Sequence, residues 1–138
     1  MEDDFGQCLV LNTRMAARAI TRAYDRKLRP FGVTAAQFSL LVSIRRAEGR
    51  SVSTLAQGLG MDRTTLSRNL DLLQRKGLVA CEAADKGNGR LCHLAPKGQT
   101  LVGELVPHWR QAQADMRRLL GQADLSSTVA SLQKLARL

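Results

Sequence analysis

The segment that decides the fold is STLAQGLGMDRTTLSRNLDLLQRKGL, residues 53–78. Its apolar residues repeat at helical spacing on both sides of Gly60, so we expect two short helices joined by a tight turn. In the second helix, Leu66, Leu70 and Leu73 form one apolar stripe. Helices this short need a core to pack on. The pattern is typical of a helix-turn-helix, whose second helix enters the DNA major groove.

The outward face of the second helix is basic and rich in hydrogen-bonding groups. Asp62 is a natural N-cap, because its side chain can accept an amide proton from the next turn. The turn that follows lies where a groove-inserted helix reaches base edges. The alternative is a helical hairpin whose polar side chains face only water. On the DNA interpretation, the contacting residues are Arg63, Thr64, Thr65, Ser67, Arg68 and Arg75.

A change of periodicity after this segment predicts a β-hairpin. Residues 78–82 and 90–94 have strand-like composition, and the linker between them, 83–89, is rich in turn formers. An antiparallel register centred on the linker makes one face uniformly apolar, and we expect that face to pack on the helix-turn-helix. This register places Val79 opposite Leu94 and Cys81 opposite Cys92.

Polar and charged side chains gather at the tip of this hairpin, which would be the wing of a winged helix. Lys86, Asn88 and Arg90 are placed to reach a minor groove or its phosphates. Asp85 is expected to orient Arg90 rather than to touch DNA. The alternative is a turn that serves only solubility, since its glycines would suit either role.

Helices are expected on both sides of this module. Residues 5–29 lack proline and are rich in Ala, Leu and Arg, and a further helix should begin at Thr34. Pro96 suits the first position of a long helix, and Ser126 or Ser127 would cap a last one. The apolar faces of these outer helices need a partner. A second copy is the economical choice, because symmetric dimers read palindromic operators.

The amino-acid composition favours some classes of binding partner over others. The 138 residues predict one domain, and 21 basic against 12 acidic residues give a net charge of +9, which favours a polyanionic partner. Five aromatic residues are few for stacking single-stranded bases, so duplex DNA is the better candidate. No apolar run is long enough to span a membrane, and we expect a cytoplasmic protein with no membrane partner. Three cysteines, an odd number, predict reduced thiols rather than a disulfide framework.

The layout resembles the MarR (multiple antibiotic resistance regulator) family of winged-helix transcription factors. The resemblance covers nearly the whole chain and rests on LAQGLGMDRTTLSRNL at 55–70, LQRKGLV at 73–79, the hairpin, and LAPKG at 94–98. It implies a mainly α fold with a small β-hairpin wing. The DNA-binding module would span about 33–98, flanked by dimerisation helices at 5–30 and 99–138.

The resemblance also implies a function. It predicts a homodimeric repressor that binds a palindromic operator and releases it when a small-molecule effector reshapes the dimer. Family effectors are often phenolic or other aromatic compounds, and many are anionic. The implied pocket lies between the dimerisation helices and the DNA-binding module, near Arg18, Tyr24 and Phe38.

Two alternatives stay open beside this prediction, a redox sensor and a protein-binding module, whereas a metal sensor and an enzyme find little support in the sequence. A redox-sensing repressor would use Cys8, because a thiolate near a helix N-terminus is stabilised by the amide dipoles. A metal sensor would use cysteine and histidine, but no CxxC or HxxxH spacing is present, so no metal is expected. No sequence motif of an enzyme or of a cofactor site is visible. A protein-binding winged helix without DNA contact is the last alternative.

Overall fold

The structure, a computed structural model, describes residues 3–46, 51–83 and 89–138. It is mainly helical with one two-stranded antiparallel sheet, which confirms the fold class predicted from the sequence. Two short 3-10 turns flank the first helix, at Phe5–Gln7 and Arg29–Phe31. The other elements are α1 (Leu9–Leu28), α2 (Ala35–Arg46), α3 (Val52–Leu59), α4 (Arg63–Arg75), β1 (Val79–Ala83), β2 (Arg90–Leu94), α5 (Pro96–Leu120) and α6 (Gln122–Leu135).

The helices of the central module begin at polar caps. At the start of α2, the Gln37 amide donates to Thr34 Oγ1 and the Thr34 amide donates to Gln37 Oε1, each at 3.1 Å. This reciprocal pair is a capping box, which satisfies two amides that the first turn would leave open. Gly60 ends α3 with a φ of +62°, a conformation that favours glycine. The tight turn between α3 and α4 follows from that residue.

The hairpin has the predicted register, with Val79 opposite Leu94 and Cys81 opposite Cys92. Alternation of side chains along each strand therefore puts these four residues on one face. An isolated bridge between Ser51 and Leu91 attaches the start of α3 to the other edge of β2. The hairpin is thus held on two sides, by the sheet edge and by the core.

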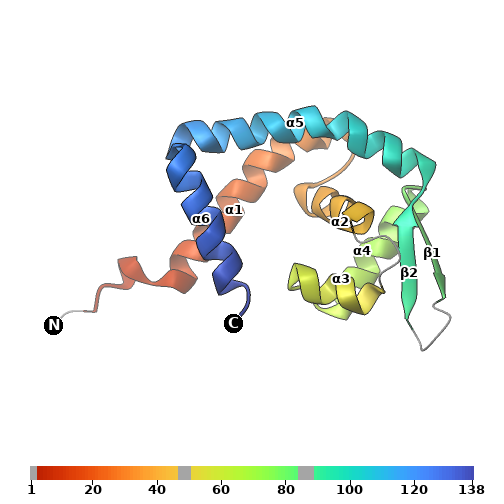
Figure 1. Cartoon of the computed structure of the whole chain (residues 1–138), viewed down its shortest axis with the longest axis horizontal. Coiled ribbons are helices and arrows are strands. Elements are labelled where there is room, and N and C mark those ends of the chain that lie inside the picture. Colours follow the sequence, from red (N-terminus) through yellow and green to blue (C-terminus); the bar gives the residue numbers. More distant parts are fainter. Residues whose placement is uncertain (1–2, 47–50, 84–88) are drawn as a thin grey trace.

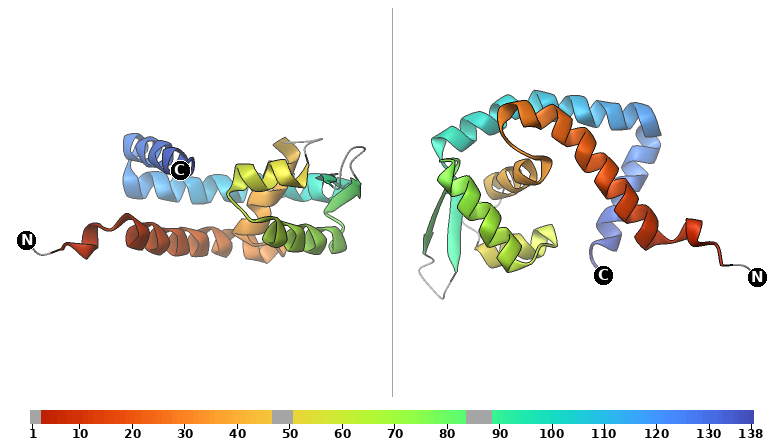
Figure 2. Two further views of the ribbon diagram at one scale, coloured as in Figure 1. Left: turned by 90° about the horizontal axis from the view of Figure 1, so that it is seen from below. Right: turned by 180° about the vertical axis from the view of Figure 1, so that it is seen from behind.

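A single hydrophobic core joins α2, α3, α4, the hairpin and the beginning of α5. The α4 stripe of Leu66, Leu70 and Leu73 is fully buried, as the helical spacing predicts. Val102 and Leu105 bring α5 onto the same core. Seen from behind in Figure 2, α4 runs alongside the hairpin, and both lie at the end of the molecule opposite α6.

The outer helices leave this core. Figure 1 shows α5 as an unbroken, gently arched helix that continues through Pro107, with α1 and α6 projecting below its far end. Every residue from 9 to 22 in α1 is exposed, and so is every residue of α6 except the half-buried Leu125. Among the described residues, no helix is both long and apolar enough to cross a membrane.

The last helix begins earlier than the sequence predicts. Gly121 follows α5 directly with a φ of +87°, and α6 starts at the next residue. Ser126 and Ser127 therefore lie inside α6 and do not cap it. The sharp turn needs only one residue with a positive φ, and glycine supplies it without a serine cap.

Candidate functional site

The predicted DNA-reading residues lie together on α4, at the end of the molecule that carries the hairpin. Arg63, Thr64, Arg68 and Arg75 are exposed, and Ser67 is half-buried. The buried leucine stripe on the opposite side fixes the rotation of the helix, so these side chains face outward. The helix therefore presents three guanidinium groups to a ligand outside the core.

The start of α4 is fixed by Asp62 and Thr65. Asp62 Oδ1 accepts the Thr65 backbone amide at 2.8 Å, and the Thr65 hydroxyl donates to Asp62 Oδ2 at 2.9 Å. The backbone hydrogen bond, followed by the hydroxyl, lowers the pKa of Asp62 below its ordinary value. The Thr65 hydroxyl thus serves the helix start, although the sequence suggested it for DNA contact.

The end of the hairpin next to its turn is tied to α4 by an ion pair. Arg90 Nη1 lies 3.1 Å from Oδ1 of Asp71, which is on the same helix as Arg68. The sequence interpretation gave this role to Asp85. Residues 84–88 lie outside the described residues, so Lys86 and Asn88, like Asp85, are not placed. In the structure Arg90 therefore links the hairpin to α4 through Asp71.

The cysteines differ from the sequence prediction. Cys81 and Cys92 form a disulfide across the hairpin, whereas reduced thiols were expected. The number of cysteines does not decide whether two of them can pair. Here the strand register places Cys81 directly opposite Cys92, so these two can form a bond. Cys8 is free and exposed at the start of α1. No group of three metal-ligating side chains forms within the part of the chain that the structure describes.

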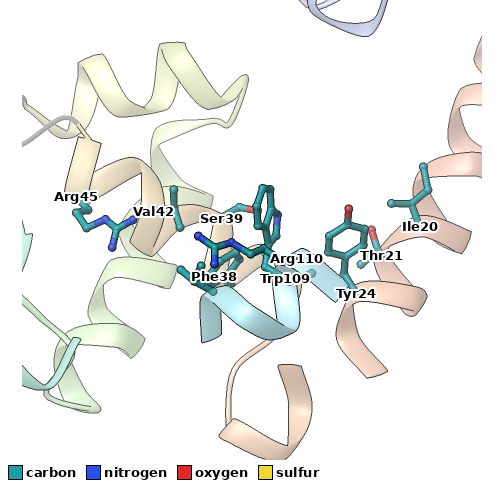
Figure 3. Close-up of a pocket in the computed structure, with 12 residues that line it drawn as sticks. Ile20, Thr21, Tyr24, Phe38, Ser39, Val42, Arg45, Trp109 and Arg110 are labelled. Carbon is teal, nitrogen blue, oxygen red and sulfur yellow. The ribbon is translucent and has the colours of Figure 1, made fainter. Parts of the chain in front are cut away.

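A pocket of about 650 Å³ lies between α1, α2 and α5. Figure 3 shows Tyr24 of α1 across from Trp109 of α5, with the Arg110 side chain extending on the other side toward Phe38 of α2. Arg45 adds a second guanidinium at the end of α2. The pocket is thus largely apolar and carries two fixed positive charges. Of the residues suggested from the sequence, Tyr24 and Phe38 line it, whereas Arg18 is exposed on α1 and is not among its lining residues.

The pocket wall on α1 is bonded to both neighbouring helices. The Tyr24 hydroxyl donates a hydrogen bond to Gln113 Oε1 of α5. The next residue, Asp25, accepts the Ala35 amide at 2.7 Å and so caps α2. Burial, followed by the negative charge of Asp115, raises the pKa of Tyr24 above its ordinary value. Lys27 Nζ pairs with Asp115 at 3.6 Å.

Several of these residues were not identified from the sequence. Asp71 gives no sequence signal of its pairing with Arg90, because that pairing requires knowing which side of the hairpin packs on α4. Trp109 is one of several apolar residues at helical spacing in its segment, and nothing in the sequence distinguishes it as a pocket residue. Arg45 and Arg110 carry no sequence signal, since an arginine in a charged helix usually faces water. Their role depends on how α2 and α5 meet.

Comparison with known proteins gives a consistent result. Residues 31–91 match the family model described as MarR family. The transcriptional regulator MosR of M. tuberculosis, solved in complex with DNA, is 37% identical, with a TM-score of 0.83 and coverage of 95% of this chain and 97% of that chain. A mutant of E. coli MarR complexed with operator DNA is 25% identical, with a TM-score of 0.84 and coverage of 97% and 99%.

A curated relative is the putative transcriptional regulatory protein for the hcr operon of Thauera aromatica, 25% identical over 107 residues. The match covers 77% of this chain, and the chain spans 64% of the length of that relative. The identity and near-complete coverage of MosR agree with the family model. The chain therefore belongs to the MarR family, whose members are winged-helix, DNA-binding transcriptional regulators.

Proposed function

We propose that the chain is a homodimeric repressor that binds a palindromic DNA operator and is released by a small aromatic acid. The observation that carries this proposal is the exposed basic face of α4 beside the hairpin, joined by the Asp71–Arg90 ion pair. A helix of this kind reads base edges, while a wing adds contacts to the neighbouring groove or phosphates. The net charge of +9 supports a polyanionic partner.

The DNA-binding test compares arginines in different places. Duplexes selected from a random library provide the specific probe, and a scrambled duplex provides the control. Arg68→Ala should cost about 1 to 3 kcal/mol on selected duplexes and relax base preference. Arg90→Ala should weaken binding more evenly across sequences, because it removes a contact of the wing. Arg26→Ala removes the same charge from exposed α1 and should leave selectivity unchanged.

Fluorescence anisotropy over a salt series gives both the affinity and its electrostatic component. Selective binding that survives Arg68→Ala would show that α4 does not read the bases. Failure of the unaltered chain to select any duplex would favour a winged helix that binds protein alone. The two results can be told apart, because selective DNA binding persists in the first and is absent in the second.

The proposed dimer rests on the outer helices. Residues 9–22 and nearly all of α6 are exposed, yet they carry large apolar side chains that a monomer would leave in water. A second copy related by a twofold axis would cover them and place two α4 helices in successive major grooves. The exposed apolar side chains include Leu9 (64%), Val10 (68%), Met15 (54%), Leu132 (46%) and Leu138 (106%).

Leu9→Glu tests this interface. Because Leu9 contributes nothing to the buried core, a charge there should leave the protomer folded and still separate the dimer. Sedimentation equilibrium would measure the association state, and circular dichroism would check helicity. A dimer that is equally stable with Leu9→Glu would place the interface elsewhere.

The proposed effector site is the pocket between α1, α2 and α5. Its apolar lining suits an aromatic ring, and Arg45 and Arg110 suit a carboxylate. Trp109 lines the pocket and is the one tryptophan in the sequence, so its fluorescence reports occupancy directly. A series of hydroxybenzoates should quench it, and their neutral amides should quench it far less.

Arg110→Gln should weaken binding of the acids but not of the amides. Arg14→Gln removes an exposed arginine outside the pocket lining and serves as the matched control. Equal affinity for acids and amides would contradict the proposed role of the arginines. Quenching without any change in DNA affinity would contradict the proposed release.

A further inference from the structure

The disulfide in the hairpin joins two directly opposed residues. Cys81 of β1 and Cys92 of β2 face each other with their Cα atoms 4.2 Å apart. Antiparallel pairs have a Cα separation of about 4.5 Å where no ladder hydrogen bonds join them and about 5.5 Å where bonds do, so this is a pair of the close kind. The strand register alone therefore brings both sulfur atoms together, whether or not they are bonded.

The surroundings hold this pair in place in either redox state. The neighbouring pair, Val79 and Leu94, is buried in the core, and Leu91 is bridged to Ser51 on the outer edge of β2. Opening the disulfide removes a covalent bond and leaves these contacts intact. The reduced hairpin should therefore keep its fold and register, so the bond can form and break in the folded protein.

The two sulfur atoms differ in access. Cys92 is 2% exposed, whereas Cys81 is half-buried. A small thiol reagent can therefore reach the disulfide only from the Cys81 side. Because of this difference in exposure, Cys81 is the sulfur that exchanges with the reagent. Cys92 then attacks Cys81 and releases the reagent from the mixed disulfide.

We propose that Cys81 and Cys92 form a thiol–disulfide switch that sets how tightly the wing holds DNA. The oxidant is a low-molecular-weight disulfide, RSSR. The Cys81 sulfur attacks it and forms a mixed disulfide with release of RSH, and the Cys92 sulfur then attacks Cys81 and releases a second RSH. Two electrons and two protons leave the protein dithiol, and reduction by two RSH reverses both steps. The switch rests on the DNA binding proposed above.

The disulfide is connected to the DNA-binding face through Arg90. Arg90 lies two residues before Cys92, so both side chains are on the same face of β2. The cross-link thus sits between the buried Val79–Leu94 pair and the Arg90–Asp71 ion pair. In the oxidised protein, the covalent bond fixes the strand that carries Arg90 against α4.

Reduction leaves the outer part of the hairpin less restrained. Beyond Cys81 and Cys92, β1 and β2 are paired through Glu82–Leu91 and Ala83–Arg90, and the link to α4 is the exposed ion pair. Exposed ion pairs contribute little to stability, so the reduced wing should sample more conformations. DNA binding must then order the wing, and we expect affinity to fall about 3- to 10-fold, because ordering a segment on binding opposes association. The change should appear mainly in a faster dissociation rate.

The experiment uses the full chain in a Cys8→Ser background, which removes the free exposed thiol and any cross-link between copies. Oxidised protein and protein reduced with dithiothreitol are separated by their thiol titre and by intact mass. Fluorescence anisotropy then measures affinity for one selected duplex in both states. The oxidised form should bind more tightly, and exposure of the reduced form to oxidised glutathione, a linear disulfide of the RSSR kind, should restore the tighter binding.

Cys81→Ser is the matched variant, because Cys81 is the half-buried partner and its loss disturbs packing least. It should bind like the reduced protein under all conditions, and Cys92→Ala should do the same. Equal affinity of the oxidised and reduced forms would overturn the switch, as would tighter binding by the reduced form. If neither form selects a duplex, the proposed DNA binding fails and the switch fails with it. Mass and thiol titre would still record whether the bond forms.

Discussion

Replacing Gly98 by alanine should destabilise the protein, even though alanine is the better helix former. Gly98 is buried in the first turn of α5, where an added Cβ would lie 3.0 Å from the Leu78 carbonyl carbon and closer still to its oxygen. That oxygen accepts the Ala95 amide at 3.0 Å, so it is not free to move aside. The close contact between Gly98 and Leu78 holds the start of α5 against the segment that joins α4 to β1.

The magnitude follows from three contributions. Alanine in a helix interior gains about 1 kcal/mol over glycine. Overpacking a close contact costs about 1 to 3 kcal/mol. Weakening the hydrogen bond from Ala95 costs about 1 kcal/mol more. The net expectation for Gly98→Ala is a loss of about 1 to 3 kcal/mol in the free energy of unfolding.

Gly103→Ala in the same helix is the matched control. Gly103 is exposed, and an added Cβ would meet nothing within 4 Å among the described residues. This variant should gain about 0.5 to 1 kcal/mol. Urea unfolding followed by circular dichroism, at one fixed protein concentration, measures both. A Gly98→Ala protein as stable as the Gly103→Ala protein would refute the close contact with Leu78.

Three further outcomes are expected. Asp62→Ala should lower the urea midpoint of unfolding through loss of the N-cap, whereas the Asn side chain of Asp62→Asn can still accept the capping hydrogen bond. Since the pKa of Asp62 is lower in the folded chain than its ordinary 3.8, the stability that the charged carboxylate adds over Asp62→Asn should shrink as pH falls below 3.8 and disappear once the folded-state carboxyl is protonated. The raised pKa of Tyr24 means that the unfolded chain ionises first, so stability should fall as pH rises above 10.0, less steeply with Tyr24→Phe. Leu70→Ala, at a fully buried position, should cost about 3 to 5 kcal/mol in the same unfolding assay.

The sequence predicted those features that depend on local spacing. The leucine stripe of α4 follows from helical periodicity, and the Asp62 cap follows from residue type. The hairpin register was predictable because a shift of one residue would turn Val79 and Leu94 away from the core. In each case the physical cause acts over a few residues or along one strand pair.

Features that depend on contacts between distant elements were not predictable in this way. The contact between Gly98 and Leu78 requires the closest approach of two segments, and composition carries no sign of it. The ion pair of Arg90 with Asp71 depends on how the hairpin packs against α4, which the sequence does not show. Periodicity identifies the face that packs, but not which residue lies across from it.

The bonds at the end of α1 have a mechanical consequence for the proposed dimer. Tyr24 and Lys27 attach α1 to α5, and Asp25 attaches it to α2, all within one helical turn. The 20-residue helix is therefore a stiff rod about 30 Å long, and in the proposed dimer its exposed end would lie near the twofold axis. A tilt at that end would move the two protomers in opposite senses. A displacement of about 1 Å in each protomer would then change the separation of the two α4 helices by about 2 Å. B-form DNA keeps successive major grooves about 34 Å apart, so the two helices would no longer match both grooves.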